Sequence, residues 1–391
     1  MGALPVGARA VVTKPACRIV VCANQAWNLV NFRSGLIAEL QRQGCEVIAI
    51  APPDPEMEAR LAEMGCRFVP VGIDAMGLSP LRDLGTLLQL RRIIRREKPD
   101  AWLSWTIKPN VYGVLAARSC GVKAYPNVSG LGTAFIRTNL VTRVVKLLYR
   151  TAFKGASRVF FQNADDAALF TDARLVDPAR VTFLPGSGID PKHWRSPDGN
   201  RPKPRQFLMV ARVVGDKGVR EYVAAARAVR MRWPDTVCRL MGPIDVANRT
   251  AIGREEFAGW LAEGLIEHVE PSGDVRPQMI AADFVVLPSY REGLSRVLLE
   301  ASAMGRPIVT TDVPGCRDVV RDGESGFLCK PADAESLTAA MARACETSDA
   351  DWHRMAAEGR RRAIEEFSIE RVNRIYLDTL RETGALPVAN G

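Results

Sequence analysis

The sequence of 391 residues lacks several features that identify common classes of protein. No apolar run approaches the roughly 18 residues that a transmembrane helix needs, so no membrane-spanning helix is expected. The nine cysteines are scattered and form no C-x-x-C pair. The sequence therefore indicates neither a zinc site nor a disulfide framework, and reduced thiols are expected.

Acidic residues are absent from Ala101 to Ala164, although this stretch contains nine basic residues. Residues 1–185 contain 24 Lys/Arg and 14 Asp/Glu, a net charge of +10, whereas residues 186–391 contain 29 and 30, a net charge of −1. A basic block of this kind indicates an anionic partner for the first half: nucleic acid, phospholipid or a phosphorylated substrate. A merely solubilising surface is the alternative.

Strand-like and helix-like segments alternate through the first half of the chain. Apolar β-type runs are followed by stretches with helical spacing, and residues 32–44 end in a glycine typical of a helix C-terminus. This alternation predicts a parallel sheet with crossover helices. The predicted strands lie at 17–24, 45–52, 101–105, 157–163 and 181–190, and the predicted helices at 32–44 and 79–100.

The same alternation restarts near residue 205, so two doubly wound α/β halves are predicted, with a ligand cleft at their facing strand ends. The composition, 47% hydrophobic and 25% charged, and the length also suggest two domains. We expect Ser368 to cap the last helix. The predicted parts are a flexible tail (1–16), an N-terminal Rossmann-like domain (17–187), a C-terminal Rossmann-like domain (188–366) and a C-terminal helix (367–391) that packs back on the first domain.

The segment "YREGLSRVLLE", Tyr290 to Glu300, contains two glutamates eight positions apart, across a predicted loop and helix. Backbone N–H groups at such a helix start suit a phosphate or a sugar hydroxyl. Glu292 and Glu300 are thus candidates for holding a ligand at two points. The alternative is that Glu292 only favours the helix dipole and Glu300 lies on the surface.

Two further segments follow predicted strands in the second half. In "ARVVGDKG" (211–218), Arg212 and Lys217 are placed to stabilise a leaving diphosphate, or are ordinary solvated charges. The segment "TTDVPGCRDVV" (310–320) contains a glycine turn.

Taken together, these segments resemble the second domain of family 4 retaining glycosyltransferases, which use nucleotide-sugars and have the two-Rossmann (GT-B) fold. The order is R-x4-K, PSYREG, E-x7-E and DVPG. In the first half, "NFRSGLIAELQRQGCEVIAIAP", "TIKPNVYGVLAAR" and "NVSGLGTAF" resemble the subgroup that acts on polyprenyl-diphosphate-linked sugars in bacterial glycan assembly.

The resemblance implies that residues 17–187 bind the acceptor and residues 188–366 the nucleotide-sugar. It also implies a role for each matching residue. Arg212 and Lys217 would hold the donor diphosphate, Glu292 the transferred sugar and Glu300 the ribose. The catalytic set is then Arg212, Lys217 and Glu292. The remaining donor-side residues would be Gly293, Leu294, Ser295, Gly273 and Val275, and the acceptor-side residues Asn24, Asn31, Arg33, Lys108, Asn127, Gly130 and Gly132. The region before Gly273 is about three residues shorter than the family pattern, which weakens the prediction of base contacts there.

A general base for the acceptor hydroxyl is not obvious in the first half. All three histidines lie in the second half, and carboxylates are missing from 101–164, although Glu39 is available elsewhere. The resemblance implies retention, for which we favour front-face attack assisted by the leaving phosphate, with a Glu292 nucleophile as the rival. Asp349 and Asp351 form a D-x-D that we interpret as a helix start, so neither a metal nor a cofactor is expected.

Residues 138–158 predict a basic amphipathic helix. Its basic residues recur every three or four positions, as suits an anionic bilayer, although an ordinary surface helix is equally consistent. The basic residues are Arg143, Lys146, Arg150, Lys154 and Arg158.

The predicted function is a hexosyltransferase that moves a hexose or N-acetylhexosamine from a UDP-sugar to a lipid-linked saccharide. The protein would lie in the cytoplasm, at the inner face of the cell membrane, without a nucleic-acid partner. The alternatives are a sugar-nucleotide epimerase and a non-catalytic binder of lipid or nucleic acid. A dehydrogenase is disfavoured because "GLGTAF" (130–135) does not complete a G-x-G-x-x-G.

Overall fold

The structure is a computed structural model that describes residues 17–387, apart from 75–78, 131–139, 197–199, 204, 245, 247 and the side chains of 140 and 141. The predicted tail, residues 1–16, lies outside the described residues. Backbone contacts divide the chain into two compact units. Unit 1 is Met1–Pro126, Gly155–Ser157 and Leu377–Gly391, and unit 2 is Asn127–Lys154 and Arg158–Tyr376. The chain therefore returns to unit 1 within its last helix.

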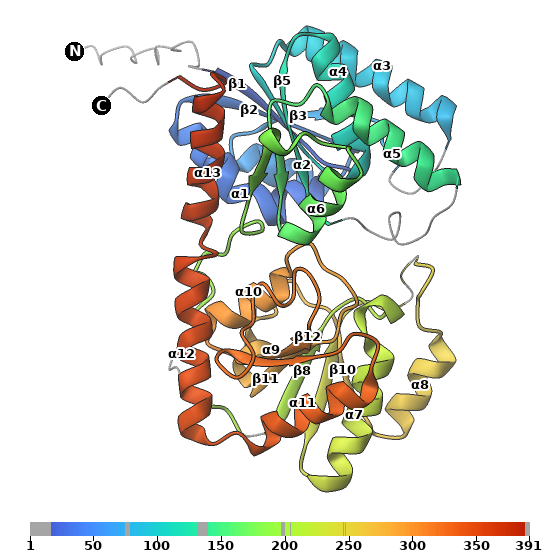
Figure 1. The fold of residues 1–391 in the computed structure, drawn as a ribbon, viewed down its shortest axis with the longest axis vertical. Helices are drawn as coiled ribbons and strands as arrows, with labels where there is room; N and C mark the ends of the chain where they lie inside the picture. Colours follow the sequence, from blue (N-terminus) through green and yellow to red (C-terminus); the bar gives the residue numbers. More distant parts are fainter. Residues whose placement is uncertain are drawn as a thin grey trace, which may run out of the picture. The chain divides into compact units, whose positions relative to one another are not determined.

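The first sheet has seven strands in the order β3-β2-β1-β4-β5-β6-β7. The buried strand β1 pairs in parallel with both β2 and β4 and so lies inside the sheet, not at an edge (Figure 1). The strands are β1 (Cys17–Cys22), β2 (Cys45–Ala51), β3 (Arg67–Pro70), β4 (Ala101–Trp105), β5 (Lys123–Val128), β6 (Val159–Phe161) and β7 (Val181–Phe183).

The helices of the first half are α1 (Ala26–Arg42), α2 (Pro55–Glu63), α3 (Pro80–Glu97), α4 (Val114–Ser119), α5 (Leu140–Phe153) and α6 (Ala164–Asp172), with a π-helical turn at Pro109–Gly113. The first helix was expected from residue 32 but begins at Ala26. Leu29 and Val30 are buried and continue its apolar face, so the helix starts six residues (32 − 26) earlier than we predicted.

The second sheet has six strands in the order β10-β9-β8-β11-β12-β13. Parallel pairing brings the carboxyl ends of β8, β11 and β12 to the same edge. The strands are β8 (Gln206–Val210), β9 (Val237–Met241), β10 (Glu267–Val269), β11 (Phe284–Leu287), β12 (Ile308–Thr311) and β13 (Gly326–Cys329).

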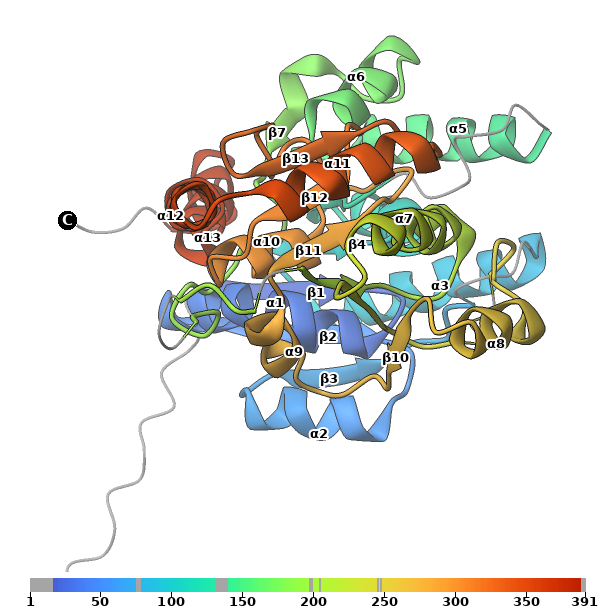
Figure 2. The same ribbon diagram turned by 90° about the horizontal axis from the view of Figure 1, so that it is seen from below.

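The helices of the second half are α7 (Val219–Arg232), α8 (Arg254–Ala262), α9 (Arg276–Ala281), α10 (Arg296–Ala303), α11 (Ala334–Glu346), α12 (Asp349–Glu365) and α13 (Ile369–Glu382). Helices α7 and α11 pack side by side, as both Figure 1 and Figure 2 show. Asp349 and Asp351 lie in the first turn of α12, which Ser348 caps, so the predicted helix start is confirmed.

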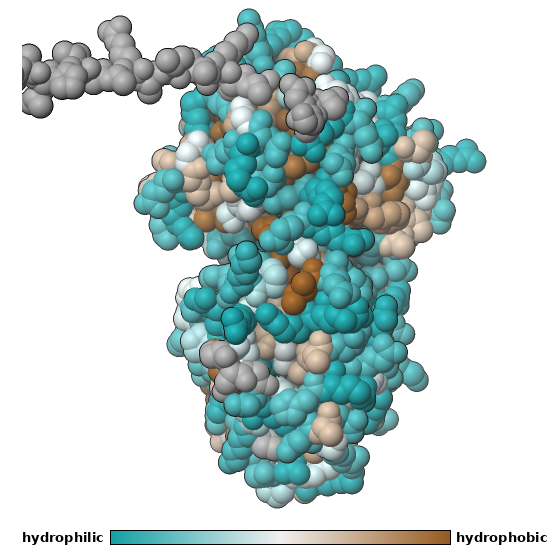
Figure 3. All heavy atoms as spheres, turned by 90° about the vertical axis from the view of Figure 1, so that its left-hand side faces the viewer, coloured by the Kyte–Doolittle hydropathy of each residue, from teal (hydrophilic) through white to brown (hydrophobic). Residues whose placement is uncertain are grey.

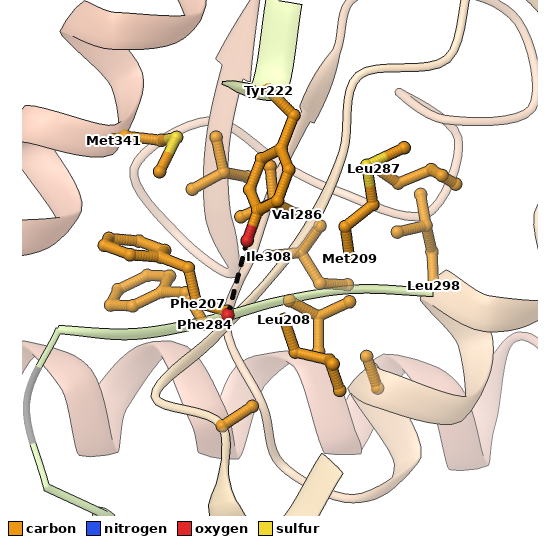
Figure 4. Close-up of a cluster of buried hydrophobic side chains, with 14 of the residues drawn as sticks. Phe207, Leu208, Met209, Tyr222, Phe284, Val286, Leu287, Leu298, Ile308 and Met341 are labelled. Atoms are coloured by element: carbon orange, nitrogen blue, oxygen red, sulfur yellow. Dashed lines mark hydrogen bonds between the residues drawn. The ribbon is translucent and has the colours of Figure 1, made fainter. Parts of the chain in front are cut away.

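The core of the second sheet is mainly aliphatic and aromatic, and among the side chains labelled in Figure 4 only Tyr222 carries a hydroxyl group. Phe207 and Phe284, on neighbouring strands, lie with ring centroids 6.2 Å apart. Tyr222 of α7 is fully buried, and its hydroxyl donates to the carbonyl oxygen of Phe207 at 3.3 Å. A buried hydroxyl must find such an acceptor, so this contact fixes α7 on the sheet.

A disulfide joins Cys17 and Cys45, whose Cα atoms are 4.7 Å apart. This corrects the expectation that all cysteines are reduced. The two residues start β1 and β2 and are direct partners in the parallel register. Only that register brings them together across 28 positions, and the sequence pattern does not show it.

The outer surface shown in Figure 3 is mostly hydrophilic, with apolar residues in small separate groups. Single exposed apolar side chains are normal on a soluble fold and need no explanation. Helix α3 carries a repeated set of them, because Leu81, Leu84 and Leu88 are 83%, 52% and 42% exposed.

Candidate active site

The loop after β8 is fixed directly against the end of β11. Gly218 has a φ of 76°, and a Cβ atom there would lie 2.1 Å from the carbonyl oxygen of Pro288. Glycine is therefore needed for both the backbone angle and the close approach. The half-buried Lys217 immediately precedes this glycine and is carried to the edge of the sheet. Arg212, earlier in the loop, is exposed, and its side chain has no ion-pair partner among the described residues.

The loop after β11 is held between its two neighbours. The backbone N–H of Tyr290 donates to the carbonyl oxygen of Asp216 at 2.9 Å. On the other side, the N–H of Glu292 donates to the carbonyl oxygen of Pro314 at 3.2 Å, and that of Ser295 to Gly315 at 3.0 Å. Three of the predicted segments thus meet at one edge of the sheet.

Lys217 and Glu292 form an ion pair at this edge. Their side chains are 22% and 15% exposed, so both charges are largely withdrawn from water. Sequence reasoning placed Lys217 on a diphosphate and Glu292 on a sugar, without predicting that they contact each other. In the structure each provides the other's charge compensation at a place that solvent still reaches.

The structure does not support the helix-start interpretation of Glu292. Helix α10 begins at Arg296, Ser295 occupies the N-cap position, and no acidic residue lies in the first turn. Glu292 lies in the preceding loop, where the glycine turn after β12 approaches it closely. A Cβ atom on Gly315 would lie 2.6 Å from the carbonyl group of Glu292. This accounts for the glycine in "DVPG".

Glu300 is buried on α10 and is not a surface residue. Loss of hydration raises the pKa of its carboxyl group to about 6, while Arg296 opposes the rise. The Arg296 Nε donates to the Glu300 Oε1 at 2.9 Å, one helical turn away. A buried carboxylate with a single cationic partner retains lone pairs for further donors such as hydroxyl groups.

The segments that follow β5 and β6 enclose Gly293. The side-chain amide of Asn163 donates to the carbonyl oxygen of Gly293 at 2.7 Å. A Cβ atom on Gly293 would lie 2.1 Å from the carbonyl oxygen of Ser129, and one on Gly130 would lie 3.5 Å from the Gly293 nitrogen. All four residues belong to unit 2. The backbone of the predicted donor loop is therefore tightly fitted.

Two ion pairs reinforce this enclosure, and sequence reasoning missed both. Arg291 pairs with Asp166, which is fully buried, and Arg317 binds both oxygens of Asp165 at 3.1 Å. Burial raises the pKa of Asp166, while Arg291 lowers it. Asp165 and Asp166 lie at the start of α6, where acidic residues commonly favour the helix dipole. The sequence alone therefore did not indicate that they form ion pairs with distant arginines.

Three of the predicted acceptor-side residues, Asn24, Asn31 and Arg33, lie in unit 1. The N–H of Asn24 donates to Thr106 Oγ1 at 3.3 Å, because β1 and β4 end side by side. The buried Arg33 guanidinium lies over the ring of Trp105, 4.6 Å from its centroid. The Asn31 amide donates to the Trp27 carbonyl oxygen at 3.0 Å.

Lys108 is part of a polar cluster that sequence reasoning did not predict. Its ammonium contacts Asp83 Oδ1 at 2.6 Å, and the hydroxyl of Tyr112 donates to Asp83 Oδ2 at 2.9 Å. Asp83 is buried on α3, 25 residues earlier in the chain. The cluster fixes Lys108 in place, two residues beyond Thr106.

The other predicted site residues are more dispersed. Asn127 is buried, and its amide donates to the Tyr376 hydroxyl at 2.7 Å, so it anchors α13. Leu294 packs closely against Gly186. Gly273 is exposed with open space around it, and Val275 precedes α9. Gly132 lies outside the described residues.

Metal-ligating side chains do not gather in the described parts of the chain: no group of three or more His, Cys, Asp or Glu residues lies close enough to hold an ion. The prediction of metal-independent chemistry remains a prediction. The site chemistry described above rests on cations and carboxylates of the chain itself.

Two family models match the chain. Residues 31–186 match the model described as "Glycosyl transferase 4-like domain", and residues 204–347 match "Glycosyl transferases group 1". The second match contains Arg212, Lys217, Glu292 and Glu300. The first contains Arg33 and the Asp83–Lys108 cluster.

Curated relatives are similar along most of their lengths. The N,N'-diacetylbacillosaminyl-diphospho-undecaprenol alpha-1,3-N-acetylgalactosaminyltransferase of Campylobacter jejuni is 26% identical over 346 residues, 82% of this chain and 87% of the relative. The UDP-Gal:alpha-D-GlcNAc-diphosphoundecaprenol alpha-1,3-galactosyltransferase of Escherichia coli is 24% identical over 319 residues, 77% and 81%. The lipopolysaccharide core biosynthesis glycosyltransferase LpsE of Rhizobium meliloti is 28% identical over 370 residues, 88% and 93%.

Solved structures show the same fold. A glycosyltransferase from Rickettsia africae superposes with a TM-score of 0.76 at 17% identity, covering 94% of this chain and 98% of that one. The Anabaena protein HepE, in complex with UDP and glucose, gives the same score and identity with 94% and 100% coverage. The two parallel sheets, the two family matches and these relatives agree. The chain belongs to the family 4-like, group 1 glycosyltransferases with the GT-B fold.

Proposed function

We propose that this glycosyltransferase moves a hexose or N-acetylhexosamine from a UDP-sugar to a polyprenyl-diphosphate-linked saccharide during surface polysaccharide or glycoprotein glycan assembly. The names of two full-length relatives support this acceptor class. The observation that carries the proposal is the Lys217–Glu292 ion pair at the strand ends, followed by the buried Glu300. These are a cation and two carboxylates in the order that a nucleotide-sugar requires.

In the proposed donor site, an ion pair between Lys217 and the diphosphate replaces the one between Lys217 and Glu292. Arg212 and Lys217 hold the diphosphate, Glu292 accepts from hydroxyls of the transferred sugar, and Glu300 accepts from the ribose. Lys217 is already a partner of Glu292, so an entering diphosphate competes for its ammonium. The hydroxyl groups of the sugar then supply the donors that Glu292 loses, and neither half-buried charge is left unpaired.

The proposed reaction is metal-independent and retains the anomeric configuration. The bond from the anomeric carbon to the leaving phosphate oxygen breaks, the acceptor oxygen bonds to the same face, and its proton passes to that phosphate oxygen. Arg212 and Lys217 stabilise the charge on the phosphate. The two relatives are named alpha-1,3-transferases, and an alpha product from an alpha-linked UDP-sugar requires retention.

The position of Glu39 does not suit a general base for the acceptor hydroxyl. It lies in the last turns of α1, where it pairs with Arg42 and accepts from Gln43. Thirteen residues separate it from Ala26, or about 20 Å of helix from the end of α1 that follows β1. Glu292 as a nucleophile remains the rival mechanism. Neither a sugar-nucleotide epimerase nor a non-catalytic binder is favoured, because the relatives and both family models are glycosyltransferases.

The proposed location is the inner face of the cell membrane, in peripheral contact with anionic lipid. None of the helices in the described residues is long and apolar enough to cross a bilayer. On α5, Arg143 and Arg150 are exposed together with Val144 and Leu147, and Lys146 is half-buried. Exposed basic and apolar side chains on one helix suit a lipid surface. Lys154, just after the helix, is also exposed.

The test of the proposal is donor consumption with a defined acceptor. The protein is incubated with a panel of UDP-sugars and a short-chain polyprenyl-diphosphate sugar, in the presence of a metal chelator. Transfer of one sugar with release of UDP is expected for at least one pair. If no pair reacts, with or without added divalent metal, the proposed function is wrong. Reaction only with added metal would retain the transferase but remove the metal-independent mechanism.

The α5 contact has its own test. Replacing Arg143, Lys146 and Arg150 together with glutamine should weaken binding to anionic vesicles, because each basic residue near the surface contributes about 1 kcal/mol. Binding equal to that of the unmodified protein would make α5 an ordinary surface helix.

A further inference from the structure

Trp27 is an exposed aromatic residue at the start of α1. Its neighbours Ala26, Leu29 and Val30 are buried, whereas Trp27 is 47% exposed. The Trp27 ring contacts the ring of Phe32, with centroids 5.1 Å apart and planes 89° apart. Such a T-shaped contact covers at most one face of an indole. Phe32 therefore supports the Trp27 ring and leaves it a flat apolar surface that solvent reaches.

Three asparagine side chains surround the start of this helix. The Asn31 amide donates to the Trp27 carbonyl oxygen at 3.0 Å, and the Asn28 amide donates to Asn24 Oδ1 at 3.2 Å. All three asparagines are partly exposed. An asparagine side chain offers a carbonyl oxygen and two N–H groups, and each of the three uses one of these in the two bonds. The groups that remain are suited to pair with the hydroxyl or amide groups of a ligand.

The loop after β4 adjoins these asparagines. The N–H of Asn24 donates to Thr106 Oγ1 at 3.3 Å, which ties the loop after β1 to the loop after β4. Thr106 has a φ of 71°, an outlier for a β-branched residue. Backbone strain of this kind persists mainly at functional sites. The next residue, Ile107, is 37% exposed. Exposed apolar groups and amides thus follow the carboxyl ends of β1 and β4, the edge at which α/β sheets bind ligands.

We infer that Trp27 stacks on the sugar ring of the lipid-linked acceptor. One face of a pyranose ring consists mainly of C–H groups, while its rim carries hydroxyl or acetamido groups. The indole covers the C–H face, and the amides of Asn28 and Asn31 pair with groups on the rim. Trp27 is then a specificity-determining residue that favours a sugar-bearing acceptor over the bare lipid diphosphate. The inference rests on the proposed function, which supplies an acceptor of this class.

The combination of an indole with amides favours a sugar over other occupants. A polyprenyl chain would cover the indole but would leave the amides without partners as they lose water. A phosphate group has no apolar face for the indole to cover. A nucleobase would stack on an indole. However, the proposed donor residues Lys217, Glu292 and Glu300 belong to unit 2, and Trp27 belongs to unit 1.

The test compares ligands that differ only in the sugar. Calorimetry measures the binding of a short-chain polyprenyl diphosphate and of the same lipid carrying N-acetylglucosamine, N-acetylgalactosamine, glucose or galactose. The unmodified protein should bind at least one sugar-bearing lipid more tightly than the bare lipid. Trp27→Ala should weaken that binding about tenfold, because stacking and buried apolar area are lost, and should change binding of the bare lipid less than about twofold.

Two further substitutions separate the aromatic ring from its bulk. Trp27→Phe keeps a flat ring and should weaken binding only about threefold, whereas Trp27→Leu keeps apolar bulk without a ring and should behave like Trp27→Ala. If Trp27→Ala does not fold, as judged by circular dichroism, Trp27→Leu decides the question. Met231→Ala removes an exposed apolar side chain from α7 in unit 2 and is the matched control. It should bind every ligand like the unmodified protein.

Turnover provides a second measurement. Trp27→Ala should raise the KM for the acceptor about tenfold and leave the KM for the UDP-sugar unchanged, because the ring contacts only the acceptor. A raised KM for the UDP-sugar alone would place the ring at the donor and overturn the inference.

Other binding results would also overturn it. Equal weakening of bare and sugar-bearing lipids by Trp27→Ala would place the ring against the lipid chain. Unchanged binding by both Trp27→Ala and Trp27→Leu, or no preference of the unmodified protein for any sugar-bearing lipid, would leave no sugar contact to explain. The binding measurement uses no donor. A sugar-selective loss in a protein that transfers no sugar would therefore contradict the proposed function and keep this inference, whereas transfer without such a loss would do the reverse.

Discussion

At the scale of single residues, the Lys217–Glu292 ion pair places opposite charges where a substrate charge is expected. Removal of either partner leaves the other as an unpaired, half-buried charge. The resulting loss of folding stability exceeds the stability that the intact pair contributes. The effect on activity and the effect on folding must therefore be measured separately.

The first prediction concerns turnover. Arg212→Ala and Glu292→Ala should each lower kcat/KM for the UDP-sugar at least about tenfold, equivalent to about 1.4 kcal/mol of transition-state stabilisation. Arg212→Ala should leave the unfolding transition unchanged because its side chain is exposed. The exposed Glu335→Gln serves as the control. Near-normal rates for both alanine variants would remove the assigned roles.

The second prediction concerns pH. The folded pKa of Glu300, about 6, lies above the unfolded value near 4.5, so the folded state binds more protons and stability falls as pH rises between these values. The penalty is about 2 kcal/mol above pH 6. The Glu300→Gln variant should therefore gain free energy of unfolding relative to the unmodified protein. Measured by chemical denaturation, this gain should be about 2 kcal/mol larger at pH 7.5 than at pH 4. A difference independent of pH would contradict the raised pKa.

Sequence patterns predicted these residues better than their contacts. The spacing of Glu292 and Glu300 identified both, but their environments, one in a loop and one buried, depend on where α10 begins. Asp83 was not predicted, because its contact with Lys108 joins positions 25 residues apart through the packing of α3. Side chains that act in such clusters carry no local signal.

At the scale of elements, the start of α6 supports the loop after β11, the predicted donor loop. Asn163 accepts from the N–H of Asp166 at 2.7 Å and donates to Gly293 at the same time. Asp166 in turn pairs with Arg291, next to Glu292. One helix start thus fixes two consecutive segments of backbone around the first glutamate.

The third prediction tests this support. Arg291→Gln should lower the unfolding free energy by about 2–3 kcal/mol, somewhat less than for a fully buried pair because Arg291 is partly exposed. Adding Asp166→Asn should restore part of the loss, since the buried charge is then removed. Asn163→Ala should weaken binding of a UDP-sugar more than binding of UDP, measured by calorimetry. Equal weakening of both ligands would mean a general structural role.

Element order was predictable where patterns are long. The strands at 101–105 and 45–51 and the helix at 80–97 were predicted nearly to the residue, because each is a continuous apolar or periodic segment. The order of strands in each sheet was not, because it depends on pairings such as β1 with β4, about 80 residues apart. The Cys17–Cys45 disulfide likewise depends on a strand pairing, that of β1 with β2, and could not be predicted from local sequence.

At the scale of the whole molecule, α13 completes unit 1 from the far end of the chain. The Thr383 hydroxyl contacts that of Tyr125 at 2.5 Å, and Lys123 donates to the carbonyl oxygen of Gly384 at 2.7 Å. Just before the chain re-enters unit 1, the ring of Tyr376 packs on Phe160 with centroids 4.7 Å apart. These contacts tie the end of the chain to β5. The predicted domains, including the packing of the last helix on the first of them, remain predictions.

The fourth prediction follows from these contacts. Tyr376→Phe removes only the hydroxyl that accepts from the buried Asn127 amide, so unfolding should become about 1–2 kcal/mol easier. Tyr290→Phe, at an exposed position, should change stability by less than about 0.5 kcal/mol. A chain that ends at Ser368 should lose cooperative unfolding altogether. Normal unfolding of that truncated chain would show that α13 is dispensable.

The composition of unit 1 has a consequence for synthesis on the ribosome. Its first segment ends at Pro126 and its last begins at Leu377, 251 positions later (377 − 126). At translation rates of about 5–20 residues per second, roughly 10–50 seconds pass before the closing helix emerges. During that interval the apolar positions that Leu377 and Leu380 later cover stay open to water or to a chaperone. The first half of this enzyme is thus the first to be made and the last to be finished.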